Sequence, residues 1–314
     1  MSKAAYAYYR LMTKILALLA VYLIWGSTYL GLRFGLEGFP PFLLNGIRFL
    51  IAGGLMVGYL WWRGSFRASR TQLWNAGRVG SLMLVGGVGL VTLAEHLGVG
   101  SAVAATAIAI IPVWAALIAG LYGDWPRRLE WVGLAVGLVG VLVLAAEGDF
   151  RSSPVGMLMV LVSPIIWAFG SVWSTKIDSP DPMSSAAIQL STAGVVMTVV
   201  GLIIGERVVT PVPAIAWGAL FYLAIFGSLI AFTAYVYLIH TVRPALATSY
   251  AYVNPVVAVV LGLTLGGEII TGAIFIALPL ILIGVGLVAL SGRQGTDLET
   301  IDGPPGLELA EEAA

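Results

Sequence analysis

Ten apolar stretches, each long enough to cross a lipid bilayer, constrain the fold of this chain more than any other feature. A transmembrane helix needs about 20 mostly apolar residues, and charged or Pro/Gly-rich breaks separate ten such stretches here. The predicted spans cover residues 14–35, 41–62, 74–95, 101–122, 129–147, 155–176, 184–205, 215–239, 245–266 and 271–291. The sequence therefore predicts an all-α membrane protein with ten transmembrane helices.

The composition excludes a water-soluble fold. An average soluble chain has about 25% charged residues, whereas only 10% of these 314 residues are charged and 59% are hydrophobic. Such a chain lacks the polar surface that would cover a soluble core of this size, so its apolar side chains must face membrane lipid. No cysteine is present, which excludes disulfides and thiolate chemistry. We predict no catalytic residues, no metal site and no cofactor.

The charges are unevenly distributed along the chain. Residues 293–314 hold six acidic residues and one arginine, and this acidic tail is predicted to be disordered. The rest of the chain has 15 basic and 10 acidic residues, a net charge of +5. It contains no basic patch large enough to bind nucleic acid.

Lysine and arginine in the loops predict the orientation, because short cytoplasmic loops retain positive charge. With the N-terminus inside, eleven of these residues fall on the cytoplasmic side: Lys3, Arg10, Lys14, Arg63, Arg67, Arg70, Arg127, Arg128, Lys176, Arg243 and Arg293. Three fall outside: Arg33, Arg151 and Arg207. Both termini are therefore expected in the cytoplasm. The first apolar stretch is too long for a signal-peptide core and is interpreted as a retained span.

Two halves of the chain are similar to each other. Residues 41–53 align with residues 182–194 with four identities, and residues 102–115 align with residues 245–258 with five. Further pairs of residues keep nearly the same spacing: Trp25 with Trp167, Asp124 with Glu268, and Gly140-Val141 with Gly284-Val285. The offset stays between 141 and 144, which indicates duplication of one unit.

The repeated unit has five helices, and an odd number makes the second copy enter the membrane from the opposite face. The sequence therefore predicts an inverted-topology repeat, an architecture typical of transporters. The predicted units are residues 1–150 with the first five helices, residues 151–292 with the second five, and the tail 293–314.

Three sequence stretches and one acidic residue resemble the EamA-domain permeases of the drug/metabolite transporter superfamily. They are LIWGSTYLGLR (23–33), RFLIAGG (48–54), PALATSYAYVNPV (244–256) and the helix-end Glu268. The resemblance covers residues 14–291. In detail it is strongest to the YedA- and YddG-type permeases of bacterial inner membranes, whose better-studied relatives export amino acids and related metabolites.

The resemblance implies a secondary exporter of small molecules, multi-pass in a bacterial inner membrane, that works by alternating access. It also implies a central cavity lined by helices 1, 3, 4, 6, 8 and 9, with helices 5 and 10 outside. Amino acids, including aromatic or apolar ones, are the expected cargo. Toxic organic compounds are the alternative. A phosphorylated cargo is disfavoured, because no set of intramembrane lysines or arginines could hold a phosphate.

The expected substrate-binding residues lie on helices 1, 3, 6 and 9. Helix 6 carries a stripe of hydroxyls and an indole at helical spacing, Ser163, Trp167, Ser171 and Ser174. Such a stripe suits a polar substrate with an apolar body, and the alternative interpretation is close helix packing. Trp25 occupies the place on helix 1 that matches Trp167. The full set is Trp25, Ser27, Glu95, His96, Ser163, Trp167, Ser171, Tyr250 and Asn254.

Two prolines are the predicted hinges. Pro112 and Pro255 lie at matched positions inside helices 4 and 9, and each removes one backbone hydrogen bond. A broken backbone is tolerated beside a cavity, although a packing kink is the other interpretation. Asn254, just before Pro255, is placed to bond either the freed backbone or the substrate. Tyr252 is expected to point elsewhere.

Few ionisable residues fall within or beside the spans. We interpret Arg48 as a structural hydrogen-bond donor to helix ends. Glu95 and His96 close helix 3 on the outer side, where they could bind an ammonium group and couple transport to protons, or form a solvated helix end. Asp124 and Glu268 are interpreted as turn residues at helix starts.

The motifs exclude some functions and leave others open. The sequence has no H-E-x-x-H and no nucleotide-binding G-x-x-x-x-G-K-[ST], so we expect neither an enzyme nor an ATP-driven pump. A passive channel stays open, because cavity residues do not show whether both gates open together. GxxxG pairs at Gly133 and Gly137 and at Gly54 and Gly58 allow close helix contact, so both a monomer and a homodimer remain possible.

The eleven-to-three charge bias predicts the topology. Reporter fusions at Gly38 and Arg151 should read outside the membrane, and fusions at Ser69 and Arg293 should read inside. Paired alkaline phosphatase and fluorescent-protein fusions measure both states. An inside reading at Arg151 would contradict the inversion of the second five helices.

Overall fold

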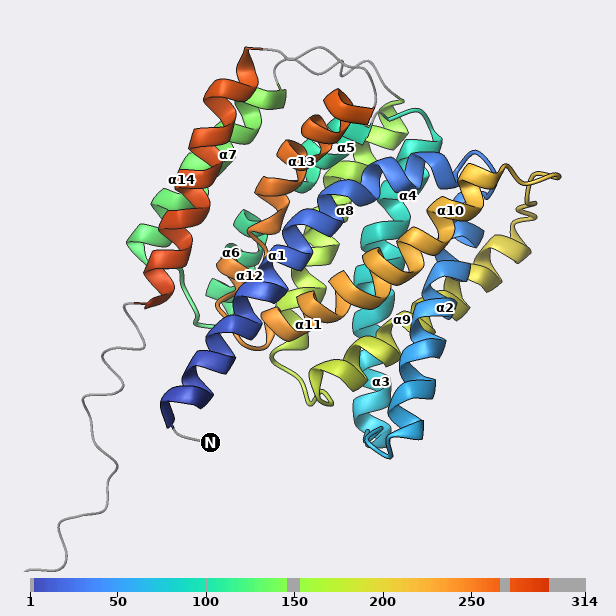
Figure 1. Ribbon diagram of the computed structural model, residues 1–314, viewed down its shortest axis with the longest axis horizontal. Coiled ribbons are helices and arrows are strands. Elements are labelled where there is room, and N and C mark those ends of the chain that lie inside the picture. Colours follow the sequence, from blue (N-terminus) through green and yellow to red (C-terminus); the bar gives the residue numbers. More distant parts are fainter. Residues whose placement is uncertain (1–2, 100, 146–152, 266–271, 294–314) are drawn as a thin grey trace, which may run out of the picture.

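The computed structural model describes residues 3–99, 101–145, 153–265 and 272–293, and in these ranges it consists of helices joined by turns. Ten spans are formed, several from two or three consecutive segments (Figure 1). In chain order they are α1 (Lys3–Gly35); α2 (Pro41–Trp62); α3 (Arg70–Gly80), η1 (Ser81–Val88) and α4 (Gly89–His96); α5 (Ser101–Ile108) and α6 (Ile111–Leu121); α7 (Arg128–Ala145); α8 (Pro154–Ser174); α9 (Pro182–Ile203); α10 (Ala214–Tyr222), η2 (Leu223–Phe232) and α11 (Thr233–Ile239); α12 (Pro244–Ala247) and α13 (Tyr250–Leu265); and α14 (Ala273–Arg293).

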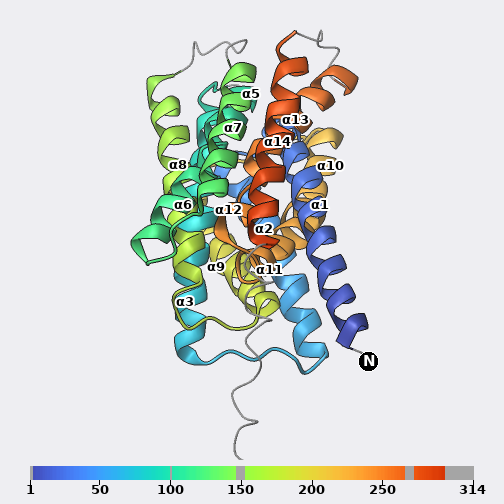
Figure 2. The same cartoon turned by 90° about the vertical axis from the view of Figure 1, so that its left-hand side faces the viewer.

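The predicted fold class is confirmed, and the span limits lie within four residues of those expected, except that α1 begins at Lys3 instead of residue 14. Among the described residues, six helices are long and apolar enough to cross a membrane, and two more apolar helices are shorter. Helix α1 begins and helix α14 ends at the same end of the bundle, here called the near end (Figures 1 and 2). The opposite end is called the far end. The acidic tail and Glu268 lie outside the described residues.

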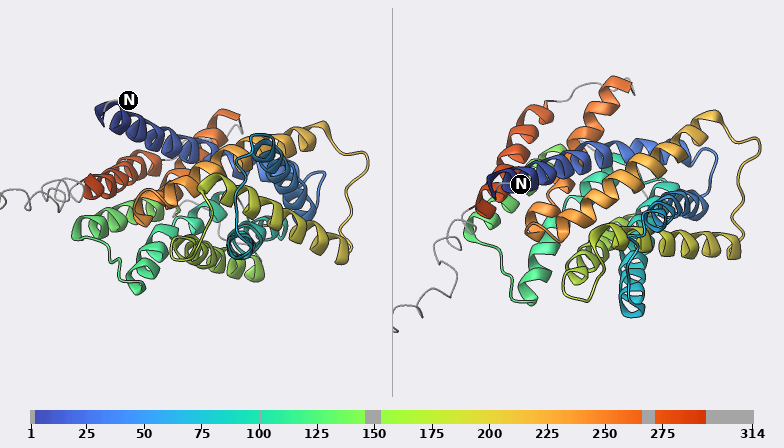
Figure 3. Two further views of the ribbon diagram at one scale, coloured as in Figure 1. Left: turned by 90° about the horizontal axis from the view of Figure 1, so that it is seen from below. Right: turned by 60° about the horizontal axis from the view of Figure 1, so that its bottom comes forward.

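Helices α7 and α14, the fifth helices of the two repeats, pack against each other at one edge of the bundle (Figure 3). Glycines make this contact possible. A Cβ added to Gly284 would lie 2.6 Å from the backbone nitrogen of Gly137 and 2.7 Å from the carbonyl oxygen of Gly133. The GxxxG pair of helix 5 therefore serves a contact inside the chain.

The second helices of the repeats, α2 and α9, form the other close pair. Here the contact is made by Gly46 and Gly53, where an added Cβ would lie 2.8 Å and 2.7 Å from the backbone nitrogens of Thr198 and Ser191. Gly54 and Gly58, which the sequence pattern suggested for close contact, are exposed and have nothing within 4 Å of an added Cβ. They lie on the other side of α2.

Two matched π-helical segments are the main feature that the sequence did not predict. η1 lies in the third span and η2 lies in the eighth, so both repeats carry one at the corresponding place. α8 packs against η1, and α1 packs against η2, so each π-helix contacts the first helix of the other repeat. π-helical turns are rare and often occur at functional sites.

The fourth and ninth spans are both broken, but at different places. In the fourth span α5 ends at Ile108, and α6 starts at Ile111 with Pro112 in its first turn. In the ninth span the break lies at Thr248 and Ser249, while Pro255 sits inside the continuous helix α13. The structure therefore breaks the fourth span just before Pro112 and keeps Pro255 inside a helix, and the hinges predicted at the two prolines stay a prediction.

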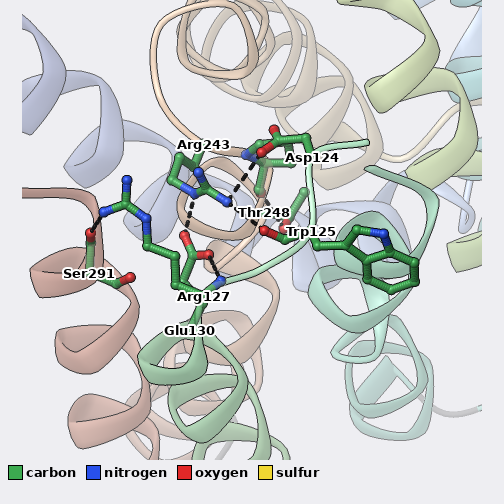
Figure 4. A network of polar contacts seen from close by, with 8 residues as sticks. Asp124, Trp125, Arg127, Glu130, Arg243, Thr248 and Ser291 are labelled. Atoms are coloured by element: carbon green, nitrogen blue, oxygen red, sulfur yellow. Dashed lines mark hydrogen bonds and ion pairs between the residues drawn. The ribbon is translucent and has the colours of Figure 1, made fainter. Parts of the chain in front are cut away.

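A polar network ties four segments together at the near end (Figure 4). Arg243, just before α12, donates to the buried Glu130 of α7 at 2.5 Å and pairs with Asp124 at 3.3 Å. Glu130 also accepts from the backbone N–H of Arg127 at 2.8 Å, and Arg127 donates to the carbonyl of Ser291 at 2.9 Å. The network joins α12, the α6–α7 turn, α7 and α14. Asp124 lies in the connection between α6 and α7, four residues before α7 begins, and pairs with Arg243 instead of starting a helix.

The α7–α14 contact predicts opposite effects at two glycines of the same helix. Gly284→Ala should lower the melting temperature of the detergent-solubilised protein, because backbone atoms on α7 cannot move aside for the methyl group, and overpacking costs about 1–3 kcal/mol. Gly286→Ala is the matched control, since an added Cβ there meets nothing within 4 Å. It should leave stability unchanged or raise it slightly. Equal melting temperatures for the two variants would contradict this packing.

Candidate functional site

A central cavity lies between the two repeats. Its volume is about 90 Å³, below the roughly 300–1,000 Å³ of typical small-molecule sites. Its walls come from α1, α2, η1, α4, α5, α6, α8, η2 and α13. These are the six expected spans plus the second span, which contributes Arg48 and Phe49. No described residue of α7 or α14 lines it, as expected for helices 5 and 10.

Four aromatic side chains form what we call the aromatic floor: Trp25, Trp167, Tyr235 and Tyr250. The ring centre of Trp25 lies 4.6 Å from that of Tyr250 and 5.5 Å from that of Trp167, both edge to face. Tyr235 completes the group, 5.5 Å from Tyr250 and also 5.5 Å from Trp167. Edge-to-face aromatic pairs add stability beyond the area they bury. Since α1, α8, α11 and α13 each supply one ring, the floor joins the two repeats.

Hydrogen bonds fix the floor to the π-helical segments. Trp25 donates from Nε1 to the carbonyl of Gly227 in η2 at 3.0 Å. In the opposite direction, Ser163 of the second repeat, which lies four residues before Trp167 on α8, donates to the carbonyl of Gly87 in η1 of the first repeat at 2.9 Å. An added Cβ on Gly87 would lie 2.8 Å from the indole of Trp167, so glycine is required there for the indole to fit. The π-helices thus position both indoles.

Further hydrogen bonds lie on the near-end side of the floor. Trp167 donates to the hydroxyl of Tyr235 at 3.3 Å, and Tyr235 donates to Ser171 at 2.7 Å. The hydroxyls of Tyr22 and Ser249 are 2.6 Å apart, linking α1 to the break before α13. These contacts close the central cavity toward the near end.

A second cavity lies on the near-end side of these contacts, with a volume of about 780 Å³. Most of its walls are apolar, and basic residues predominate among the charged side chains, with Lys14, Lys176 and Arg243 against Asp124; His240 also lines it. Burial lowers the pKa of His240, which follows the end of α11, so this imidazole favours its neutral form. The two cavities share no lining residue, and none of the four rings of the aromatic floor lines the near-end cavity.

The far-end half of the central cavity is polar. Arg48, Ser228 and Asn254 line it and are each 6% exposed or less. The Nε atom of Arg48, the hydroxyl of Ser228 and the amide oxygen of Asn254 have no hydrogen-bond partner within the described parts of the chain. Tyr29 lies beside Asn254, and the charge of Glu95 acts on both Tyr29 and Arg48. Buried polar atoms without a partner are costly, which makes them candidates for contact with a ligand.

Five of the nine predicted substrate-binding residues line the central cavity: Trp25, Ser163, Trp167, Tyr250 and Asn254. The other four do not. Ser27 bonds the hydroxyl of Tyr222 at 2.5 Å, Ser171 lies on the near-end side of the floor, and His96 is exposed at the end of α4. Glu95 acts on the cavity through Arg48 and Tyr29 without lining it. The roles of all nine stay predictions.

The two prolines and Tyr252 lie away from the cavity walls. Pro112 and Pro255 are buried and adjoin the lining residues Ile111 and Asn254. Their gating role stays a prediction. Tyr252 donates to the carbonyl of Leu134 in α7 at 3.1 Å, so it points away from the cavity, as expected.

Sequence reasoning missed several cavity residues that share one helix face. Tyr29 lies four residues after the predicted Trp25 on α1, and Ser228 and Phe232 lie at i and i+4 on the eighth span. That spacing was the available signal. Arg48 was interpreted as a donor to helix ends, but it lines the cavity, and its Nε atom has no hydrogen-bond partner within the described ranges.

Comparison with known proteins places the chain in a family. The model of the EamA-like transporter family matches residues 12–146 and again residues 154–290. The chain is 46% identical over 275 residues to an uncharacterized inner membrane transporter, YedA, of Escherichia coli K12, covering 87% of this chain and 90% of that protein. It is 25% identical to a probable amino-acid metabolite efflux pump of Salmonella typhimurium, over 53% of this chain and 54% of that protein. One solved crystal structure superposes with a TM-score of 0.75 at 25% identity, covering 90% of this chain and 98% of that one. The chain therefore belongs to the EamA-like transporter family.

Proposed function

We propose that this transporter exports small polar metabolites, most of all amino acids with an aromatic or apolar side chain, by alternating access through the central cavity. The cavity carries the proposal: it has an aromatic floor at one side and buried, unsatisfied polar atoms at the other. The proposal includes a bacterial inner membrane with both termini in the cytoplasm. The direction of transport, export, rests on the family resemblance.

The chemistry of the cavity suits a molecule with one polar end and one apolar end. Three rings of the aromatic floor, Trp25, Trp167 and Tyr250, line the cavity and offer stacking area. Ser228, Asn254 and Arg48 offer hydrogen-bonding atoms to a polar head. An amino acid with an aromatic side chain has both parts, and a relative at 25% identity is named as an amino-acid metabolite efflux pump.

The arrangement of the two cavities supports alternating access. The aromatic floor stands between the central cavity and the near-end cavity, so a molecule that crosses the bundle must pass it. Inverted repeats provide two related conformations for such a passage. The near-end cavity, with Lys14 and Lys176 on its walls, would then be the entry from the cytoplasm.

A passive channel is the second candidate, and an exporter of toxic organic compounds differs from the proposal in cargo alone. Counterflow separates carrier from channel. Purified protein in liposomes loaded with unlabelled phenylalanine should accumulate labelled phenylalanine transiently, and unlabelled substrate on the far side should accelerate exchange. Uptake without trans-stimulation would favour a channel. A panel of amino acids and hydrophobic cations, with empty liposomes as control, identifies the cargo class.

Trp167→Ala should reduce transport of aromatic or large apolar cargo about twofold to tenfold, since an aromatic contact contributes about 0.5–1.5 kcal/mol. The lost stacking area is the physical reason. Transport rates normalised to the amount of reconstituted protein measure the effect, and Trp167→Phe should restore part of it.

Phe169→Ala is the matched control, because Phe169 is 40% exposed on the same helix and stacks on Trp173, away from the cavity. It should leave transport unchanged. If Trp167→Ala transports every cargo as well as the parent does, the indole is a packing residue.

A further inference from the structure

We infer that Arg48 binds the carboxylate of the transported molecule, so that the cargo class is a small carboxylate with an apolar body and an amino group. This assignment rests on the proposed function and adds a residue to it. Among the described residues that line the cavity, Arg48 alone carries a charged side chain.

The position of Arg48 is unusual for a charged group. It lies about two turns from the far-end start of α2, and only 6% of its surface is exposed. Its guanidinium carbon lies 4.6 Å above the centre of the Phe49 ring, a contact that holds the head group in place. A buried cation is costly unless its donors are satisfied. The Nε atom of Arg48 has no hydrogen-bond partner in the described ranges.

The matching position of the second repeat shows that the fold does not need this charge. Arg48 aligns with Gln189, which is also buried, and their helices α2 and α9 pack against each other as a symmetric pair. A neutral amide serves the structural position in α9. The guanidinium in α2 therefore requires another explanation, and binding an anionic group in the cavity supplies one, because guanidinium donors match a carboxylate in two parallel hydrogen bonds.

The charge balance favours a zwitterion over a dianion. Glu95 interacts electrostatically with Arg48, and the formal charges of this pair cancel. A molecule with one carboxylate and one ammonium group keeps it neutral. The carboxylate then contacts Arg48, while the ammonium group lies toward Glu95 and the unsatisfied oxygens of Ser228 and Asn254. A phosphate monoester would bring a second negative charge that this cavity does not compensate.

Equilibrium binding to the purified full chain tests the assignment without requiring transport. Calorimetric titration compares phenylalanine with phenylalaninamide, which lacks the carboxylate, and with 3-phenylpropionate, which lacks the ammonium group. The parent protein should bind phenylalanine about tenfold to hundredfold more tightly than the amide, the ratio expected for charge-assisted hydrogen bonds. Phenylpropionate should fall between them.

Variants then locate the preference. Arg48→Gln places at this position the residue found in the second repeat. It should weaken the binding of phenylalanine about tenfold to hundredfold and change the affinity for phenylalaninamide by less than about threefold. Arg48→Lys should keep part of the preference, because an ammonium group lacks the planar fork. Arg78→Gln is the matched control, since Arg78 is exposed on α3 beside the ring of Trp74, and its binding profile should equal that of the parent.

Three outcomes would overturn the assignment: equal affinity of the parent for phenylalanine and its amide, an unchanged preference in Arg48→Gln, or no binding of any carboxylate in a panel of aromatic and aliphatic amino acids. If Arg48→Gln does not fold, the analogue series on the parent decides. Carboxylate-selective binding without counterflow would contradict the proposed transport and leave the assignment standing. Counterflow without carboxylate selectivity would support the proposed transport and contradict the assignment of Arg48.

Discussion

Two hydrogen bonds between the repeats support the centre of this molecule. Trp25 of the first repeat donates to the carbonyl of Gly227, and Ser163 of the second repeat donates to the carbonyl of Gly87. In a bilayer every buried backbone group needs a partner, and a π-helical turn displaces carbonyls from the regular ladder. Cavity side chains of the opposite repeat meet that need. The π-helices, the indoles and the cavity between them therefore depend on one another.

Most of the fold could be predicted because the bilayer restricts what a backbone can do. Span lengths, the odd number of helices in each repeat and the pairing of Trp25 with Trp167 follow from hydropathy and self-alignment. The π-helical segments and the break at Thr248 and Ser249 could not be predicted in this way. They depend on contacts between side chains far apart in the sequence. One example is the hydrogen bond between Tyr22 and Ser249, which are 227 residues apart.

The candidate site was predictable where residues repeat and missed where the repeats differ. Trp25 and Trp167 were found from their matched positions and both line the cavity. Arg48 was assigned a structural role because its counterpart is a glutamine, although that mismatch also shows that the fold does not require the charge. Ser171 was grouped with the cavity by helical spacing, but the hydroxyl of Tyr235 occupies it. Spacing identifies a helix face and does not show how deep along the helix a ligand reaches.

The differences between the repeats determine the chemistry of the cavity. Tyr250 and Asn254 of α13 correspond to Ala107 and Ile111 in the first repeat, so one wall is aromatic and polar while its counterpart is aliphatic. A backbone built from inverted repeats can exchange its open side by symmetry, but these side chains cannot be exchanged. The near-end closure is therefore made of aromatic rings and hydroxyls, whereas the far-end half holds Arg48 and the influence of Glu95. In the proposed export, a cargo moving toward the far end would pass from the aromatic rings to Arg48.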